Sequence, residues 1–286
     1  MSTDTTYSKH DQRNLLLLFL FFLCHLFPAE FEVVSGWNDP VAAYPLEATG
    51  KDASRCVNGD AHFFEKGEIR SWPGGKLVFR KSNLEQFARI TNSDGNFKLK
   101  DMTMIISFRV SDLGRRTIAQ FVVNDKSILL LSLKDLDLHF SLSSKCGNKT
   151  RVRELKLQLA QNTTLQKWTL AAVTYNQTSG YATLYASSNS EQNACKVYWG
   201  PVNIAEPQYI YLANNIEFIT GAIKDNEQQS PENFSGRIKC FILYRRVLDF
   251  SQIGEVGRFC RKMLTKGSYG DKIGRASCRE RVCQYV

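Results

Sequence analysis

The sequence predicts an all-β protein made of two packed antiparallel sheets and one short helix near the C-terminus. Three observations support this prediction. Short segments of alternating apolar and polar residues recur along the chain, turn-forming Gly, Asn and Asp residues separate them, and only one segment has helical spacing. About a dozen short strands with one terminal helix do not suit a sheet that carries helices on both faces. Two stacked sheets are the simplest alternative.

The expected strands differ in how many of their faces are buried. In Met102–Val110 and Leu136–Leu142 every second side chain is apolar, so each segment should bury one face. Ser127–Leu133 and Thr169–Tyr175 are apolar at both parities and are expected to be central strands covered on both sides. Three further segments continue the strand pattern: Ala182–Ser187, Tyr209–Ala213 and Gly236–Tyr244.

One hairpin is expected in the middle of the chain. Gly180 lies between two strand-like segments and permits the left-handed backbone of a tight turn. We expect Trp168 and Leu170 to enter the core from the first strand, and Leu184 and Tyr185 to approach from the second. Core packing, rather than a ligand site, is the expected role of these aromatic side chains.

The single helix is expected close to the end of the domain. Asp249 or Ser251 is a candidate N-cap, and Ile253, Val256 and Cys260 follow at spacings of three and four residues. Two internal glycines lower the helix propensity of this segment.

The chain is expected to have three parts: a signal peptide at 1–35, one domain at 36–264 and an unstructured tail at 265–286. Two basic residues precede the apolar run Leu15–Phe27, which is short for a bilayer span of ~20 residues and typical of a secretory signal. An uncleaved N-terminal anchor is the alternative. No second apolar run approaches that length, so we expect no membrane insertion of the mature chain.

The last residues look like translated adapter sequence. One reading frame of a common sequencing adapter encodes Ile273–Val282, so we interpret Ile273–Val286 as a read-through artefact. Under this interpretation Cys278 and Cys283 have no biological role, and the natural C-terminus, with any further domains, is missing. A natural basic tail is the alternative.

Five cysteines remain between the two ends, and exported chains normally oxidise such thiols. No pair has C-x-x-C spacing, so a zinc site is not expected. Cys240 and Cys260 are the nearest pair, and Cys146 with Cys195 is a second candidate pair. Cys56 would then be free or paired outside the domain.

Four Asn-X-Ser/Thr sequons after a signal peptide also favour export. Their asparagines are expected on surface loops because a glycan cannot be buried: Asn148, Asn162, Asn176 and Asn233. Of these, Asn176 lies where the expected hairpin reverses.

Three segments resemble the laminin-G-like, concanavalin-type jelly roll, a family that includes the pentraxins. Ala42–Phe63 is similar to the opening strand and its loop, although Arg55-Cys56 replaces the usual Gly-Asn. Trp168–Ser187 resembles the central strand pair, in which W-x-x-[AV]-x-x-Y-[DN]-x-x-[ST]-G-x-A-x-L-Y recurs, with one more residue between Trp168 and Tyr175 in this chain. Phe234–Cys260 resembles the closing strand, helix and cysteine. The resemblance implies a two-sheet antiparallel jelly-roll sandwich with a binding role.

The resemblance also suggests calcium, which this family often holds at a sheet edge. Three oxygen-bearing residues, Asp52, Asn58 and Asp60, lie together in the opening loop, and Asp125 lies in another turn. Ordinary turn residues that bond their own backbone are the alternative. We expect no required cofactor, with calcium as the one candidate ion.

Catalytic groups are sparse. Only His62 and His139 remain after trimming, and the H-E-x-x-H, G-x-S-x-G and P-loop patterns are absent. Glycosidases on the same jelly roll use two glutamates that flank an aspartate, but Asp135 and Asp137 have no glutamate at either spacing. We therefore expect no enzyme activity. A divergent glycoside hydrolase is kept as an alternative.

The charge of the chain favours polyanionic partners. The net charge is +9, and the two ends contribute −2 and +2, so the middle also carries +9. Lys149, Arg151 and Arg153 share one side of an extended segment, about 6–7 Å apart. Arg115 and Arg116 are expected to add to this cluster. Guanidinium groups match sulfate oxygens, although a glycan on the neighbouring sequon, or a merely solvated surface, would weaken this interpretation.

The sequence as a whole predicts a secreted, glycosylated, non-enzymatic module that recognises an extracellular glycan or glycoprotein. A heparan-type sulfated glycan is one candidate for this partner. Nucleic acid is not an expected partner. A structural matrix or cell-surface module that binds another protein is the first alternative.

Overall fold

The computed structural model describes residues 40–44, 46, 62–65, 70–72, 76–79, 86–92, 95, 97, 100–146, 149–159, 167–188, 191–213 and 234–262. All of them lie in one compact unit, Asp39–Val286. The expected signal peptide (1–35) and tail (265–286) lie outside the described residues, so both stay predictions. The same holds for the boundaries of the expected domain, 36–264.

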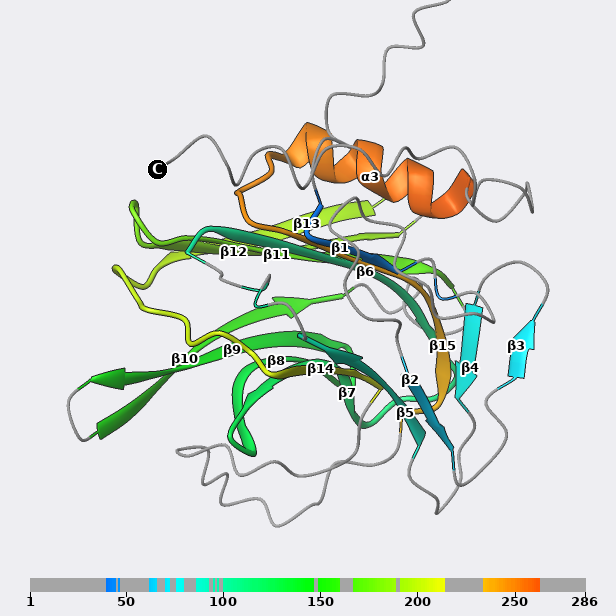
Figure 1. The fold of residues 1–286 in the computed structure, drawn as a ribbon. Coiled ribbons are helices and arrows are strands. Elements are labelled where there is room, and N and C mark those ends of the chain that lie inside the picture. The colour runs from blue at the N-terminus through cyan, green and yellow to red at the C-terminus, as the bar shows by residue number, and fades with distance from the viewer. Residues whose placement is uncertain are drawn as a thin grey trace, which may run out of the picture. The chain divides into compact units, whose positions relative to one another are not determined.

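The described strands form two antiparallel sheets, here named sheet A and sheet B (Figure 1). Sheet A has eight strands: β13 (Glu191–Tyr198), β12 (Tyr181–Ser188), β11 (Thr169–Asn176), β6 (Met102–Val110), β15 (Gly236–Tyr244), β4 (Lys76–Phe79), β3 (Arg70–Trp72), and β1 (Ala42–Tyr44), which pairs with β15 off the main path. Sheet B has seven strands, in the order β10 (Lys149–Gln158), β9 (Asp137–Cys146), β8 (Lys126–Lys134), β7 (Arg115–Val123), β14 (Tyr209–Leu212), β5 (Gln86–Thr91) and β2 (His62–Glu65). The predicted two-sheet jelly-roll sandwich is confirmed.

The chain crosses repeatedly between the two sheets. Strand β6 of sheet A is followed by β7 to β10 of sheet B, and β11 to β13 then return to sheet A. As a result β6 pairs with β11 on one side and β15 on the other, although both come much later in the sequence. These long-range pairings place the edge strands β13 and β10 on the same side of the sandwich, where they contact each other.

The core lies between the two sheets. The predicted inward face of β6 is confirmed, because four alternate side chains have no exposed surface: Met104, Ile106, Phe108 and Val110. From sheet B, Leu131 and Phe140 enter the same cluster, and Phe241 of β15 packs edge-on against Phe121. Burial of each such side chain stabilises the fold by about 1.5–3 kcal/mol.

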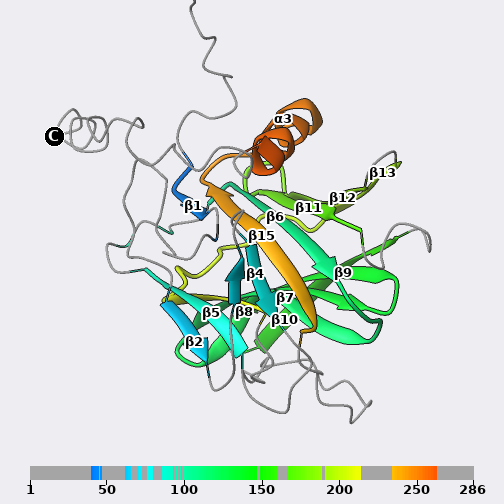
Figure 2. The ribbon, with the colours of Figure 1, turned by 90° about the vertical axis from the view of Figure 1, so that its right-hand side faces the viewer.

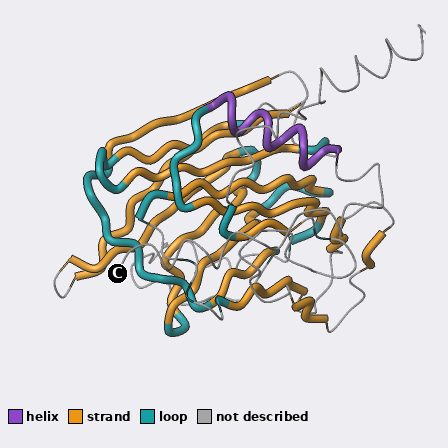
Figure 3. The backbone as a smooth tube through the Cα atoms, turned by 45° about the horizontal axis from the view of Figure 1, so that its top comes forward, coloured by secondary structure: helices purple, strands orange, loops and turns teal. Residues whose placement is uncertain are grey.

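One helix lies within the described residues, α3 (Phe250–Lys262), and it covers the outer face of sheet A (Figures 2 and 3). Phe250 packs edge-on against Tyr185 of β12 at a centroid distance of 4.6 Å. A Cβ atom at Gly257 would lie 2.4 Å from Leu170 Cδ2, so the glycine allows the helix to approach β11 closely. Sheet A is therefore buried on both faces along β11, as predicted for that strand.

This second layer corrects the predicted packing of the hairpin. Of the four side chains expected in the core, only Leu184 belongs to the cluster between the sheets. Leu170 and Tyr185 face the helix instead. Trp168 lies beneath the Lys239 ammonium, 5.4 Å from its ring centroid. In β11 the residues at even and odd positions are both apolar, so the sequence allowed either face of the strand to point into the core. The position of helix α3 decides which face packs between the sheets and which packs under the helix.

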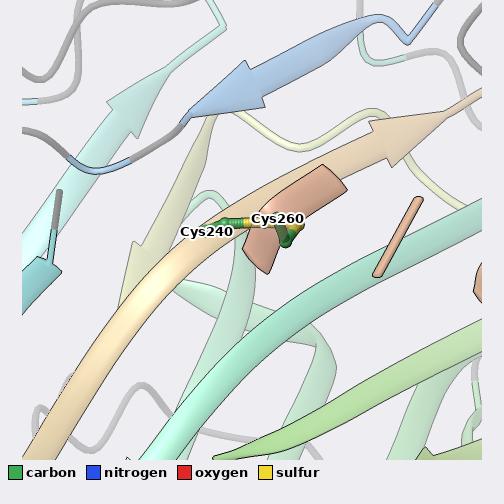
Figure 4. Close-up of a disulfide and its surroundings, with 2 residues drawn as sticks. All are labelled: Cys240 and Cys260. Atoms are coloured by element: carbon green, nitrogen blue, oxygen red, sulfur yellow. A yellow bond between two sulfur atoms is a disulfide. The ribbon is translucent and has the colours of Figure 1, made fainter. Parts of the chain in front are cut away.

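The helix is fixed at both ends. Asp249 is the N-cap: its Oδ1 accepts a hydrogen bond from the Gln252 backbone N–H at 2.9 Å, and Gln252 Oε1 accepts one from the Asp249 N–H at 3.0 Å. The hydrogen bond from the Gln252 N–H, together with one from the Ser251 hydroxyl at 2.7 Å, lowers the pKa of the Asp249 carboxyl. Near the other end, Cys260 forms a disulfide with Cys240 of β15, with Cα atoms 6.0 Å apart, as the spacing suggested (Figure 4).

The second candidate disulfide is not formed. Cys195 is a free thiol, and in β13 its side chain packs against the core cluster. Cys146 is the last residue of β9 and pairs with Lys149 across the end of the β9–β10 hairpin. The two cysteines therefore lie on different sheets, and one faces inward. Cys56 lies outside the described residues.

Candidate functional site

The predicted basic segment is the edge strand of sheet B, with one edge unpaired among the described strands and with β13 of sheet A in contact. Among the described strands β10 pairs with β9 alone, and in Figure 1 this hairpin extends beyond the neighbouring strands. Arg153 lies opposite Leu142, and Arg151 lies opposite Ser144. Directly opposed residues share a face. Since Leu142 belongs to the core, the inner face of β10 changes from apolar to basic toward the tip of the hairpin.

The two β10 arginines have no acidic partner in the described part of the chain. The Arg151 side chain is exposed and makes no hydrogen bond or ion pair with a described residue, whereas the half-buried Arg153 donates Nη1–H to Ser144 Oγ at 2.9 Å. Both guanidinium groups therefore keep most of their donors for a ligand. Lys149 follows the same alternation and pairs with Cys146.

Arg115 and Arg116 do not join this cluster. Arg116 is only 1% exposed, lies 3.2 Å from the Asp112 carboxylate and donates to the Leu113 carbonyl at 3.3 Å. An anion in solution therefore cannot reach it. In the strand register Arg115 of β7 lies opposite Lys134 of β8. This is the end of sheet B that lies away from the tip of the β9–β10 hairpin. Because adjacent strand residues point to opposite faces, the Arg115-Arg116 pair could not act together.

The outer face of the β9–β10 hairpin carries two cross-strand pairs of polar side chains. Lys156 Nζ lies 2.7 Å from Asp137 Oδ2, and His139 Nδ1 lies 2.5 Å from Glu154 Oε1. The hydrogen bond from His139 is the main reason why the pKa of Glu154 is lowered. These pairs engage His139, one of the two histidines left as catalytic candidates, and Asp137, one of the two aspartates considered for a glycosidase. The other candidate, Asp135, lies in the turn before β9, with a φ of 54°.

The calcium candidates are only partly described. Asp52, Asn58 and Asp60 lie outside the described residues, and Asp125 occupies an exposed turn. Asn124 and Asp125 both have positive φ angles, 46° and 56°, as a two-residue hairpin turn requires. Within the described ranges no group of three or more His, Cys, Asp or Glu side chains is arranged to hold a metal ion.

The expected glycosylation site at Asn176 lies on the β11–β12 hairpin. Asn176 ends β11, and its Oδ1 accepts a hydrogen bond from the Ser179 N–H at 2.7 Å. The turn then passes through Gly180, with a φ of 71°, as expected. The three other sequon asparagines, Asn148, Asn162 and Asn233, lie outside the described residues.

An exposed aromatic pair lies beside this hairpin and was not predicted. Tyr181 is 43% exposed and Tyr198 is 62% exposed, and their rings meet edge-on at 5.3 Å between centroids. The Lys196 ammonium lies 4.5 Å from the centroid of the Tyr181 ring. The signal was present in the sequence, because Tyr181 alternates with Ala182 and Leu184, which belong to the core. We name Tyr181, Lys196 and Tyr198 the tyrosine patch.

Similar solved structures are receptor-binding domains. The binding domain of botulinum neurotoxin DC in complex with rat synaptotagmin II is 13% identical, with a TM-score of 0.59 over 78% of this chain and 52% of that one. The same domain in complex with SialylT is 14% identical, with a TM-score of 0.58 over 79% and 52%. The serotype C1 binding domain is 17% identical, with a TM-score of 0.58 over 79% and 53%.

These likenesses show the fold alone, a β-sandwich of the jelly-roll kind. The chain spans about half the length of the solved structures it matches. No protein-family model matches the chain, and no curated protein matches it in sequence. Among the described helices, none has the length and apolar character needed to cross a bilayer.

Proposed function

We propose that this chain is a secreted, glycosylated binding module that recognises an extracellular glycan or glycoprotein and catalyses no reaction. In this proposal the domain belongs to the laminin-G-like, concanavalin-type jelly rolls, and a signal peptide at 1–35 precedes it. A binding role is supported by the fold, which is shared with receptor-binding domains. The non-catalytic part is supported by the described His139 and Asp137 side chains, which are engaged in cross-strand contacts with Glu154 and Lys156.

The observation that carries the proposal is the pair of arginines on the β10 edge, neither of which has an acidic partner among the described residues. Arg151 and Arg153 are alternate residues of one strand, so their Cα atoms are about 6–7 Å apart. Each planar guanidinium can donate two parallel hydrogen bonds to a sulfate or carboxylate group. With a net charge of +9, the chain also attracts polyanions over a longer range. A sulfated glycan of the heparan type is the ligand class that this edge fits best.

Heparin affinity chromatography of the secreted chain tests this site. The Arg151→Ala/Arg153→Ala variant is compared with Arg245→Ala, which removes an exposed arginine outside β10. We expect the double variant to elute at clearly lower salt than the wild type. Arg245→Ala should shift elution much less, because it changes the net charge but leaves the edge intact. Thermal unfolding of each variant controls for the loss of the Arg153–Ser144 bond.

Co-elution of all three proteins would contradict the β10 site. A glycan array, run with and without a chelator, then distinguishes a lectin with a different site from a module that binds proteins. Loss of array binding on chelation would assign a role to calcium. Shortened products after incubation with polysaccharides would contradict the non-catalytic part of the proposal.

A further inference from the structure

Three residues form a row across the outer face of sheet A. Asn176 of β11 is directly opposite Tyr181 of β12, and Tyr181 is directly opposite Tyr198 of β13. Opposed residues of antiparallel strands have Cβ atoms about 4.5–5.5 Å apart and share a face. The sequon asparagine is therefore the immediate neighbour of the tyrosine patch.

The Asn176 side chain is arranged so that its nitrogen can carry a substituent. Its Oδ1 is held by the Ser179 N–H, and the hydrogen bonds within the described chain leave its Nδ2 unused. Thr178, which completes the sequon, is exposed. The fold thus accommodates a group on Nδ2 without breaking the turn, and that group would emerge beside the Tyr181 ring.

The tyrosine patch has the surface that a sugar ring fits. A tyrosine offers an apolar ring face and a polar hydroxyl, and a pyranose offers an apolar C–H face and polar hydroxyls. Two such rings at 43% and 62% exposure leave apolar area in water that a neighbouring sugar would cover. Lys196, 4.5 Å from the Tyr181 centroid, supplies a donor for sugar oxygens at the same place.

We propose that Asn176 carries an N-linked glycan whose first N-acetylglucosamine packs on Tyr181 and Tyr198. The inference relies on the export proposed above. Attachment forms a bond between Asn176 Nδ2 and the sugar C1, breaks the bond from C1 to the diphosphate of a lipid-linked oligosaccharide donor, and releases one amide proton. The patch is then covered by the chain's own glycan, and the β10 edge stays available to an external ligand.

A mutant cycle on the secreted chain tests this contact. Thr178→Ala removes the sequon but keeps Asn176 and its bond to Ser179. We expect this change to lower Tm by about 2–4 °C in the wild-type background. The shift should persist in Tyr181→Phe, which keeps the ring, and should fall to near zero in Tyr181→Ala. Glycopeptide mass spectrometry measures occupancy of Asn176 in each sample.

A second measurement does not depend on the stability of the variants. Trimming the glycan to one N-acetylglucosamine should leave Tm unchanged, and the acetyl methyl signal of that sugar should be shifted upfield in NMR spectra by the tyrosine rings. Equal Tm shifts in all backgrounds, or an unshifted methyl signal, would overturn the inference. If the secreted chain carries glycans at other sequons but none at Asn176, this inference is overturned and the proposed export is not. A chain that is neither exported nor glycosylated would overturn the proposed export as well.

Discussion

At the scale of single residues, two buried tyrosines show how much a hydroxyl depends on its partners. Tyr175 and Tyr244 both have no exposed surface, and burial raises the pKa of each phenol. The Tyr175 hydroxyl donates to the Gly200 carbonyl at 2.9 Å and accepts from the Val202 N–H at 2.6 Å. The Tyr244 hydroxyl has no hydrogen-bond partner in the described chain. Only the first hydroxyl fixes a segment, the one that leads from β13 toward β14.

The two tyrosine-to-phenylalanine variants should therefore differ. Tyr175→Phe leaves a buried N–H and a carbonyl unpaired, so we expect the free energy of unfolding to fall by about 1–3 kcal/mol. Tyr244→Phe removes a buried polar group that makes no hydrogen bond, and should be neutral or slightly stabilising. Urea unfolding of both variants measures the difference, and equal losses would contradict this account of the two hydroxyls.

At the scale of elements, helix α3 is stabilised by its caps and its contacts more than by its composition. The capping box at Asp249 and the Cys240–Cys260 disulfide hold the two ends, while Phe250 packs on β12. Gly254 and Gly257 appear equivalent in the sequence, since both lower helix propensity. Only Gly257 has a packing role, because it faces Leu170 of β11, whereas no atom lies within 4 Å of a Cβ built at Gly254.

Alanine substitutions at the two glycines should separate propensity from packing. We expect Gly254→Ala to raise the free energy of unfolding by about 0.5–1 kcal/mol, the usual gain in an open helical position. Gly257→Ala should give a smaller gain or a loss, because the new methyl group must displace the Leu170 side chain. The check is denaturant unfolding with the disulfide intact. If Gly257→Ala stabilises as much as Gly254→Ala, the close approach of helix and sheet is wrong.

At the scale of the whole molecule, the sequence predicted what is local and missed what depends on long-range pairing. Alternation within Met102–Val110 identified a strand and its inward face, because the period of two is set by the strand itself. The destination of Leu170 could not be predicted, since it depends on a helix about 80 residues later that returns to the same sheet. Likewise Arg116 and Arg151 share a charge, but the first lies buried beside Asp112 and the second on an open edge.

The candidate site was also predicted only in part. The segment around Arg151 and Arg153 was identified from its charge and spacing, and the structure places both arginines on one side of an edge strand. The tyrosine patch was missed because aromatic residues in strands are usually core residues. Its exposure follows from the position of β12 and β13 at the edge of sheet A, beyond the reach of the Phe250 contact.

The central claim is that a β-sandwich with an open basic edge binds an acidic glycan and leaves it chemically unchanged. Titration calorimetry of the secreted chain with a defined heparin oligosaccharide, followed by analysis of the recovered sugar, tests both parts in one sample. We predict saturable binding that weakens as salt is raised, is lost in Arg151→Ala/Arg153→Ala, and returns intact oligosaccharide. Absence of binding at low salt, or recovery of shortened oligosaccharide, would contradict the claim.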